Sequence, residues 1–442
     1  MPSVYLRMAL VMLIFGGLMT LLRRVQARWA PQPEILRKLL HVGMGLVALS
    51  FPWLFPECWP VSFLAGLSVL ILLSLRWVPP LRRDYGQVID GVARRSLGDI
   101  YFPIAVGIVF YLSGGNPILF GIPVLVLALA DAVGALIGTR YGLVQYDTLD
   151  GHKSLEGSVA FFTVTLLSTH IPLLLGTSTG RAESLLIGLT LGLLIMLMEA
   201  VAWRGLDNLF IPIGGYLLLK NYLTLDLTTL LGRFCAALAL VVLVLSWRRH
   251  ATLNHSAMVS AMLFGYACWA LGGWPWLVAP VTLYLSYTRL SPVVNKKGPQ
   301  VSLNAVLSTA SMGLVCLFLA KTQQRLDLFY VYTLSVAIHL SLIMLVRLKF
   351  NFPQMSPLRL FGACIGKSWL LVILPLVLIQ GLRLLTLIQL VAAMPILALA
   401  VFIFFRLQPA ISDYPIDPQR WIRQGIISAC SACLGQITIY WQ

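Results

Sequence analysis

Charged side chains are scarce in this sequence, and acidic ones are the scarcest. Only 11% of the 442 residues are charged, against about 25% in an ordinary soluble domain. The 16 Asp and Glu residues are outnumbered by 32 Lys and Arg residues, and 59% of the chain is hydrophobic. A single soluble core cannot hide that much apolar surface, because burial saturates as domains grow. The composition therefore predicts an all-α, polytopic integral membrane protein.

Apolar runs long enough for a spanning helix, about 20 residues, recur along the chain. The run 368–405 is about twice that length, so we interpret it as two helices on either side of Arg383. With the shorter candidates included, the length rule predicts roughly 11 to 15 transmembrane helices. The clear runs are 4–22, 38–55, 60–78, 117–137, 157–176, 183–201, 227–246, 302–320 and 327–347. The shorter candidates are 101–113, 208–219, 256–272, 274–290 and 423–441.

Positive charge is confined to alternate loops, which excludes a nucleic-acid-binding role for the net charge of +16. This alternation is the positive-inside pattern, and it places the first basic loop in the cytoplasm and the N-terminus outside. The loops around Glu57 and Asn116 are nearly free of positive charge. The basic clusters are Arg23, Arg24, Arg28, Arg37 and Lys38; Arg82, Arg83, Arg94 and Arg95; Arg248 and Arg249; and Lys296 and Lys297.

Signatures of soluble sites are missing. The seven cysteines are scattered and lie mostly in apolar runs, so we expect neither a zinc site nor a disulfide framework. The nearest approach to a nucleotide-binding loop is GACIGKS at 362–368, which is one residue short between its glycines and precedes an apolar helix. A nucleotide site in this chain must be a membrane-embedded one of another type.

A charged break at 246–256, SWRRHATLNHS, divides the chain into two expected domains, 1–250 and 251–442. Most acidic side chains at a membrane boundary lie in the first domain. The second has a polar stretch, 347–367, that we interpret as a cytoplasmic loop. We expect a structural or lipid-holding role for the second domain.

The stretch from Ala130 to Phe162 carries the strongest chemical signal. Asp131, Ala135 and Gly138 share one helical face, because they are four and then three residues apart. Gly134 and Gly138 allow another backbone or a ligand to come close. A carboxylate inside a membrane helix is costly unless it is paired or binds a cation. Asp131 is therefore a candidate metal ligand or catalytic residue, and the alternative is a structural acid paired with a neighbouring Arg.

The loop that follows holds candidate phosphate ligands. Lys153, together with the amides at the start of the next helix, would attract a phosphate. Ser154 and Glu156 have a simpler alternative, since caps and first-turn acids favour helix starts in any case. The candidates for binding nucleotide or phosphate in and near this loop are Arg140, Lys153, Ser154, Glu156 and Gly157.

Two further polar clusters fall on the same side of the membrane by the charge rule. Arg37, Lys38 and His41 form RKLLH, and Glu199 and Asp207 lie in EAVAWRGLDNLFIPIGG. Carboxylates with interleaved bases suit Mg²⁺-assisted phosphoryl transfer, in which acids hold the metal and bases neutralise phosphate charge. We expect Asp131, Glu199 and Asp207 to hold metal and nucleotide, and Arg37 and Lys38 to bind phosphate. His41 is the candidate base for a hydroxyl.

These motifs resemble the polyprenol kinase family, which includes phytol kinase, dolichol kinase and a CTP-dependent diacylglycerol kinase. The resemblance covers about residues 30–245 and rests on D-x-x-A-x-x-x-G at 131–138, R-x-G at 140–142, K-S-x-E-G at 153–157, SLGDIYFPIAV at 96–106 and E…RGLDNLFIP at 199–212. It implies transfer of the γ-phosphate of CTP to a lipid alcohol, with Mg²⁺. We expect a bacterial inner membrane, with the site on its cytoplasmic face by the charge rule. It maps Asp131, Lys153, Ser154, Glu156 and Gly157 onto family motif positions.

Two alternatives stay open. Phosphatidate cytidylyltransferases carry a similar box, but a serine–proline–lysine–lysine–threonine run is expected there, and this chain has Asp150-Gly151-His152-Lys153-Ser154. A transporter or flippase of a lipid-linked substrate also fits many spans with few buried charges. Transporters often show two repeated halves, whereas the polar residues here gather in the first half. The expected partners are membrane lipids and a lipid alcohol; the sequence does not indicate an oligomeric state.

Overall fold

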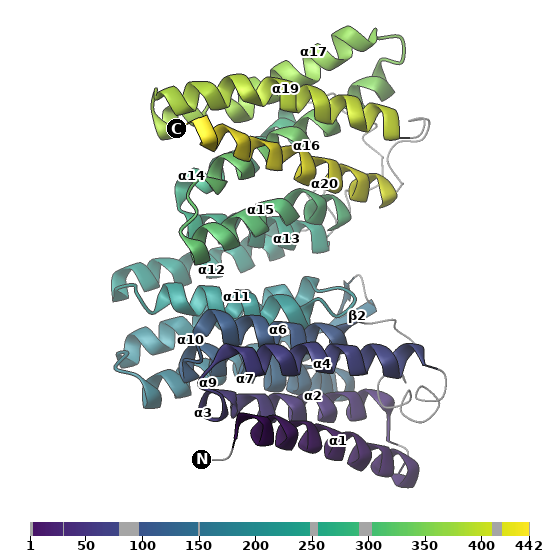
Figure 1. Cartoon of the computed structure of the whole chain (residues 1–442), viewed down its shortest axis with the longest axis vertical. Helices are drawn as coiled ribbons and strands as arrows, with labels where there is room; N and C mark the ends of the chain where they lie inside the picture. The colour runs from purple at the N-terminus through teal and green to yellow at the C-terminus, as the bar shows by residue number, and fades with distance from the viewer. Residues whose placement is uncertain are drawn as a thin grey trace. The chain divides into compact units, whose positions relative to one another are not determined.

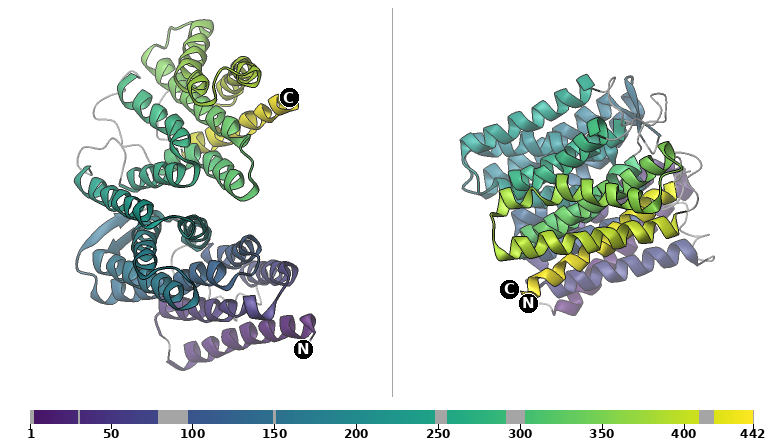
Figure 2. Two further views of the ribbon diagram at one scale, coloured as in Figure 1. Left: turned by 90° about the vertical axis from the view of Figure 1, so that its left-hand side faces the viewer. Right: turned by 90° about the horizontal axis from the view of Figure 1, so that it is seen from above.

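The computed structural model describes residues 3–29, 31–78, 97–148, 151–247, 255–290, 303–408 and 418–441. Within these ranges the chain is almost entirely helical (Figures 1 and 2). Ten of the described helices are long and apolar enough to cross a membrane, and three shorter apolar helices accompany them. The prediction of an all-α, polytopic membrane protein is confirmed.

The chain divides into two compact units, Met1–Leu245 and Ser246–Gln442. The charged break predicted at 246–256 begins at this division. The basic stretches at Arg82, Arg83, Arg94, Arg95, Arg248, Arg249, Lys296 and Lys297 lie outside the described residues. The roles expected for the two halves stay predictions.

Unit 1 consists of helices that lie side by side, with one small hairpin (Figure 1). Its elements are α1 (Val4–Trp29), α2 (Pro33–Leu49), α3 (Phe51–Leu54), α4 (Cys58–Trp77), α6 (Gly98–Ser113), α7 (Pro117–Leu125), the π-helical turn η1 (Val126–Ala130), α8 (Asp131–Tyr141), β1 (Gln145–Thr148), β2 (Gly151–Ser154), α9 (Leu155–Gly176), α10 (Arg181–Val201), α11 (Asp207–Tyr222) and α12 (Leu227–Trp247).

One continuous span of unit 1, Pro117–Tyr141, is built from α7, η1 and α8. Its start is encoded locally, since the Asn116 side chain accepts hydrogen bonds from the amides of Ile118 and Leu119, and proline occupies the first helical position. The π-helical turn lies immediately before Asp131. Such turns disturb the regular backbone ladder and are frequent at functional sites.

The loop expected between α8 and α9 is an antiparallel hairpin of β1 and β2, in which Gln145 pairs with Ser154 and Tyr146 with Lys153. Helix α9 starts at Leu155 rather than at Gly157. The Ser154 hydroxyl accepts a hydrogen bond from the Gly157 amide at 3.1 Å, which is the capping arrangement that the sequence left open as an alternative.

Helices α8 and α9 touch through glycine. A Cβ on Gly157 would lie 2.8 Å from the Gly134 carbonyl oxygen and 3.0 Å from the Gly138 Cα. Side chains at these positions would therefore push the two backbones apart. The close approach expected at Gly134 and Gly138 is confirmed, and the partner is another helix.

Unit 2 is packed around α16, whose residues from Leu328 to Leu348 are all buried. Its elements are α13 (His255–Ala267), η2 (Cys268–Gly272), α14 (Trp274–Leu285), η3 (Ser286–Leu290), α15 (Leu303–Gln323), α16 (Leu328–Asn351), α17 (Pro357–Ser368), η4 (Trp369–Ile373), α18 (Leu376–Gln380), α19 (Leu384–Leu407), α20 (Pro418–Cys433) and η5 (Leu434–Trp441).

Two expectations about unit 2 have different outcomes. The long run 368–405 is divided as predicted, because Arg383 directly precedes α19. The loop predicted at 347–367 is wrong, since α16 continues to Asn351 and α17 begins at Pro357. Helix α17 contains Pro357, Gly362 and Gly366 beside Arg359 and Lys367, residue types that are also common in loops. The GKS triplet forms the last three residues of α17, so this segment is helical and not a nucleotide-binding loop.

The cysteines include one pair at C-x-x-C spacing, Cys430 and Cys433 on α20, and both are free and exposed. The other described cysteines are also free thiols. The described residues thus contain no disulfide framework.

Candidate active site

One cavity of about 550 Å³ in unit 1 gathers most of the polar residues singled out in the sequence. The acidic and basic side chains among its described lining residues are Glu34, Arg37, Lys38, His41, Asp99, Asp131, His152, Lys153, Glu199 and Asp207. They come from α2, α6, α8, the hairpin, α10 and α11. Segments far apart in the sequence therefore meet at one site, which agrees with the prediction from the charge rule that they lie on one side of the membrane.

Lys38 and Asp131 form the most buried ion pair of the cavity, with 2.6 Å between Nζ and Oδ2. Both residues are buried, at 5% and 7% exposure. The sequence left open that Asp131 pairs with an Arg; the structure places a Lys there instead. A carboxylate at this depth costs free energy unless a cation lies beside it, and Lys38 meets that need.

A second acid, Glu34, lies one turn before these bases. It binds Arg37 through both carboxylate oxygens, at 2.6 and 3.1 Å. Its Oε1 is also 4.0 Å from Lys38 Nζ. Arg37 and Lys38 are therefore held in place by acids, which keeps their charges at the cavity instead of in lipid.

His41 is fixed by the π-helical turn. Its Nε2 lies 3.2 Å from the Leu127 carbonyl oxygen and 4.0 Å from Asp131 Oδ2. Since a carbonyl only accepts, the neutral ring carries its proton on Nε2 and leaves Nδ1 as the basic nitrogen. His41 also packs edge-on against Phe102, with ring centroids 4.7 Å apart.

Lys153 and Glu199 form a second lysine–carboxylate pair, at 2.6 Å. Lys153 also donates to the Glu199 carbonyl oxygen. Burial lowers the pKa of Lys153, but the Glu199 carboxylate more than offsets this and raises the pKa above its ordinary value. Lys153 is therefore a permanent cation at neutral pH, which suits a phosphate ligand.

The turn between α10 and α11 brings Asp207 and Asn208 to the cavity. Gly205, which also lines it, has a φ of +85°, a conformation that favours glycine. Burial, followed by the nearby Asp131 carboxylate, raises the pKa of Asp207. Asn208 is buried, and its Oδ1 has no hydrogen-bond partner among the described residues. An unpaired buried oxygen beside a carboxylate is an available ligand for a cation or a donor group.

Some predicted residues have other surroundings. Arg140 is exposed and lies over the Tyr141 ring, and it is not among the cavity's lining residues. The Glu156 carboxylate accepts a hydrogen bond from the Val144 amide at 3.2 Å. Glu156 does not line the cavity either. Ser154 and Gly157 do line it, but they are bonded to each other as a helix cap.

The expected metal ligands are not gathered into a ready-made cage. Among the described residues, no group of three His, Cys, Asp or Glu side chains is placed to hold a metal ion. Mg²⁺ is usually held by one or two carboxylates together with substrate phosphates and water, not by a protein cage. Asp131 or Asp207, with the free oxygen of Asn208, fits that mode of binding.

Sequence reasoning missed several lining residues, notably Glu34, Asp99, His152 and Asn208. Glu34 had a signal, since an acid three and four residues before Arg37 and Lys38 pairs with them on a helix. His152 and Asn208 adjoin residues that were singled out. Asp99 stands in the SLGDIYFPIAV stretch, but nothing in the sequence showed that α6 borders the cavity.

Fold and site together define a polytopic helical membrane protein with a charged cavity formed by the ends of several helices. Comparison with known proteins gives one more finding: the chain is 29% identical, over 187 residues, to a phytol kinase of Synechocystis sp.. The match covers 42% of this chain and 78% of the relative. No family model matches, and no solved structure matches.

Proposed function

We propose that the protein is a CTP-dependent kinase that phosphorylates a lipid alcohol at the cytoplasmic face of a bacterial inner membrane. The observation that carries the proposal is the single cavity in which lysine–carboxylate pairs border apolar side chains such as Leu40, Met44 and Phe161. A lipid kinase needs both environments, because a charged nucleotide must meet an alcohol that is attached to a hydrocarbon tail. The similarity to a phytol kinase supports the same activity.

The charge balance of the cavity favours a nucleotide that arrives with Mg²⁺. Five carboxylates and three Lys or Arg side chains line it among the described residues. A bare triphosphate would be repelled by this acidic excess, whereas divalent cations reverse the sign locally. When bound, Mg²⁺ would neutralise charge on the β- and γ-phosphates, with Asp131 and Asp207 as its protein ligands.

When a nucleotide binds, the lysines of the two lysine–carboxylate pairs can exchange their carboxylate partners for phosphate oxygens. Lys38 and Lys153 would leave Asp131 and Glu199 for phosphate oxygens, which accept charge-assisted hydrogen bonds. The freed carboxylates would then face the metal and the reacting hydroxyl. Because both lysine–carboxylate pairs exist before the nucleotide binds, the cavity holds the charged groups needed for phosphoryl transfer without burying an unpaired charge.

The hydroxyl of the alcohol would be received next to His41 and Asp131. In the proposed reaction, the alcohol oxygen attacks the γ-phosphorus, the bond to the β-γ bridging oxygen breaks, and CDP leaves. His41 Nδ1 is the candidate acceptor of the hydroxyl proton, and Asp131 lies close enough to stabilise the imidazolium that forms.

A neutral acceptor fits better than the phosphorylated acceptor of a cytidylyltransferase. The runs 117–137 and 157–176 contain no Lys or Arg, and the buried Lys38, which is paired with Asp131 in the structure, would already be engaged by the nucleotide phosphates. A second anion within the membrane depth of Asp131 would need further cations, and leaving it unpaired costs several kcal/mol. A neutral hydroxyl avoids that cost.

Purified protein in lipid nanodiscs tests the activity directly. CTP, ATP, GTP and UTP are each combined with phytol, geranylgeraniol, a polyprenol and diacylglycerol, and products are identified by mass spectrometry. We expect a lipid monophosphate with CTP, dependent on Mg²⁺. Absence of any phosphorylated lipid, with transport of a lipid-linked substrate into proteoliposomes instead, would favour the transporter alternative.

A further inference from the structure

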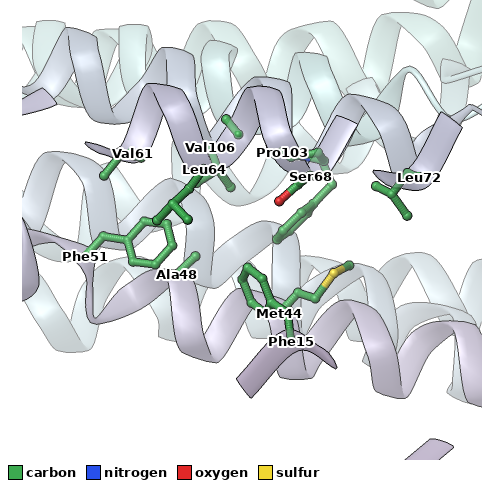
Figure 3. Close-up of a pocket in the computed structure, with 12 residues that line it drawn as sticks. Phe15, Met44, Ala48, Phe51, Val61, Leu64, Ser68, Leu72, Pro103 and Val106 are labelled. Carbon is green, nitrogen blue, oxygen red and sulfur yellow. The ribbon is translucent and has the colours of Figure 1, made fainter. Parts of the chain in front are cut away.

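Unit 1 contains an apolar furrow (Figure 3), which shares two lining residues with the charged cavity. It lies between α1, α2, α4 and α6, with Phe51 of α3 at one end. Resting on the proposed function, we propose that this furrow holds the hydrocarbon tail of the lipid alcohol and selects an acceptor with a single chain. The proposal adds a tail site to a cavity that accounts only for the head.

One side of the furrow is formed by a row of side chains along one face of α4. Val61, Leu64, Ser68 and Leu72 follow one another at helical spacing. At 1.5 Å per residue, Val61 and Leu72 are about 16 Å apart, which is about half of the hydrocarbon thickness of a bilayer. Figure 3 shows Phe51 and Val61 at one end of the row and Leu72 at the other. A tail lying here would run along the helices, as lipid tails do.

The furrow and the charged cavity are joined. Met44 and Leu72 line both of them. Phe102, which lines the furrow, packs against His41, which lines the cavity. An alcohol with its tail in the furrow would therefore carry its hydroxyl toward His41 and Asp131. This continuity identifies the occupant as the acceptor's own tail.

The furrow is narrow and apolar. Its free volume is about 40 Å³, against about 550 Å³ for the charged cavity by the same measure. So small a space suits one hydrocarbon chain better than the two chains of a diacylglycerol. Among the described lining residues, Ser68 is the one with a polar side chain, so the tail would meet almost no group that needs a hydrogen bond.

Ser68→Phe tests the proposal by filling the middle of the furrow. The measurement is the ratio of kcat/KM for geranylgeraniol to kcat/KM for 3-methyl-2-buten-1-ol, whose five carbons end near the hydroxyl. We expect the ratio to fall at least about tenfold, since displacing two methylene-sized groups from an apolar site costs about that factor. Ser62→Phe is the matched control, because Ser62 is on the same helix and exposed. Its ratio should match the wild type. An unchanged ratio in Ser68→Phe would overturn the proposal.

A photolabelling experiment separates this proposal from the proposed function, because it needs no turnover. Geranylgeraniol with a diazirine at its tail end is crosslinked to the full protein, and the labelled peptides are mapped. We expect label on α4 or α2 near Val61, Leu64 or Ala48, and less of it in Ser68→Phe. Label in the furrow without phosphorylation of any alcohol would count against the kinase and support the tail site. Label spread over exposed helix faces, with kinase activity intact, would overturn the tail site alone.

Discussion

At the scale of single residues, the buried pair of Lys38 and Asp131 has two possible purposes, and their consequences differ. A structural pair stabilises the fold by mutual neutralisation, so removing both charges together does little harm. A catalytic acid is needed for its charge in the transition state, so removing Lys38 as well cannot restore activity. Glu34 lies 4.0 Å from Lys38 and would partly neutralise it if Asp131 lost its charge.

Asp131→Asn should therefore leave a folded protein and lower kcat/KM for phosphoryl transfer at least about 100-fold, as loss of one preorganised charged group commonly does. The thermal midpoint in nanodiscs should fall modestly. The double variant Lys38→Gln with Asp131→Asn should regain stability and stay inactive. If the double variant recovered activity, Asp131 would be a structural acid only.

Lys153→Met should weaken nucleotide binding, because it removes a cation that stays charged at neutral pH. The KM for CTP is expected to rise about tenfold to 100-fold, the cost of about 1.5–3 kcal/mol for a hydrogen bond to a charged group. Arg140→Met is the matched control, since Arg140 is exposed and does not line the cavity. Equal effects of the two variants on KM would mean that the cavity is not the nucleotide site, and would favour the sequence-based assignment of Arg140 as a ligand.

At the scale of elements, the contact between α8 and α9 positions both lysine pairs. Asp131 begins α8, and Lys153 lies directly before the cap of α9. The two helices can lie this close only because glycine stands at the crossing. A change in their spacing would therefore move Asp131 relative to Lys153.

Gly157→Ala should destabilise unit 1 by about 1–3 kcal/mol, the usual cost of overpacking a tight contact. The added Cβ would lie 2.8 Å from a backbone oxygen, which cannot move like a flexible side chain. Activity should fall along with the thermal midpoint. Gly66→Ala serves for comparison, because a Cβ there has nothing within 4 Å. A neutral Gly157→Ala would show that the crossing is looser than described.

The sequence predicts a helix well where the length and apolar character of a segment determine that it is helical. The division at Arg383 followed from length alone, and the shared face of Asp131, Ala135 and Gly138 followed from helical spacing. The hairpin and the π-helical turn η1 could not be foreseen. A four-residue strand carries little periodicity, and a π-helical turn has the same composition as the helix around it. The pairings Lys38–Asp131 and Lys153–Glu199 depend on tertiary packing that no local pattern encodes.

At the scale of the whole molecule, a CTP-dependent kinase needs its charged cavity on the side of the membrane where CTP is found. Asn116 precedes the span Pro117–Tyr141, and the hairpin residue Gly151 follows it. A single crossing therefore separates them. Cysteines introduced at Gly151 and Asn116, in a chain whose native cysteines are replaced, should label from opposite sides, with Gly151 on the cytoplasmic side. Labelling of both from one side would remove the basis for a cytoplasmic site.

Unit 2 has its own core around α16 and is a separate compact unit. All the proposed catalytic and nucleotide-binding residues lie in unit 1. Between Ser311 and Ile411 the sequence has a single carboxylate, Asp327, which pairs with Arg325. The distribution of acidic residues in the sequence thus indicated that the candidate site residues lie in unit 1. It could not assign a role to unit 2. Lipid holding by unit 2 remains a prediction.

The most direct test of the kinase is to determine which phosphorus of CTP reaches the lipid. Purified protein is incubated with geranylgeraniol, Mg²⁺ and either γ-labelled or α-labelled CTP, with Asp131→Asn in parallel. The account predicts γ-label in the lipid and CDP as the nucleotide product, both lost in the variant. Pyrophosphate release with α-label in the lipid would contradict it and establish a cytidylyltransferase instead.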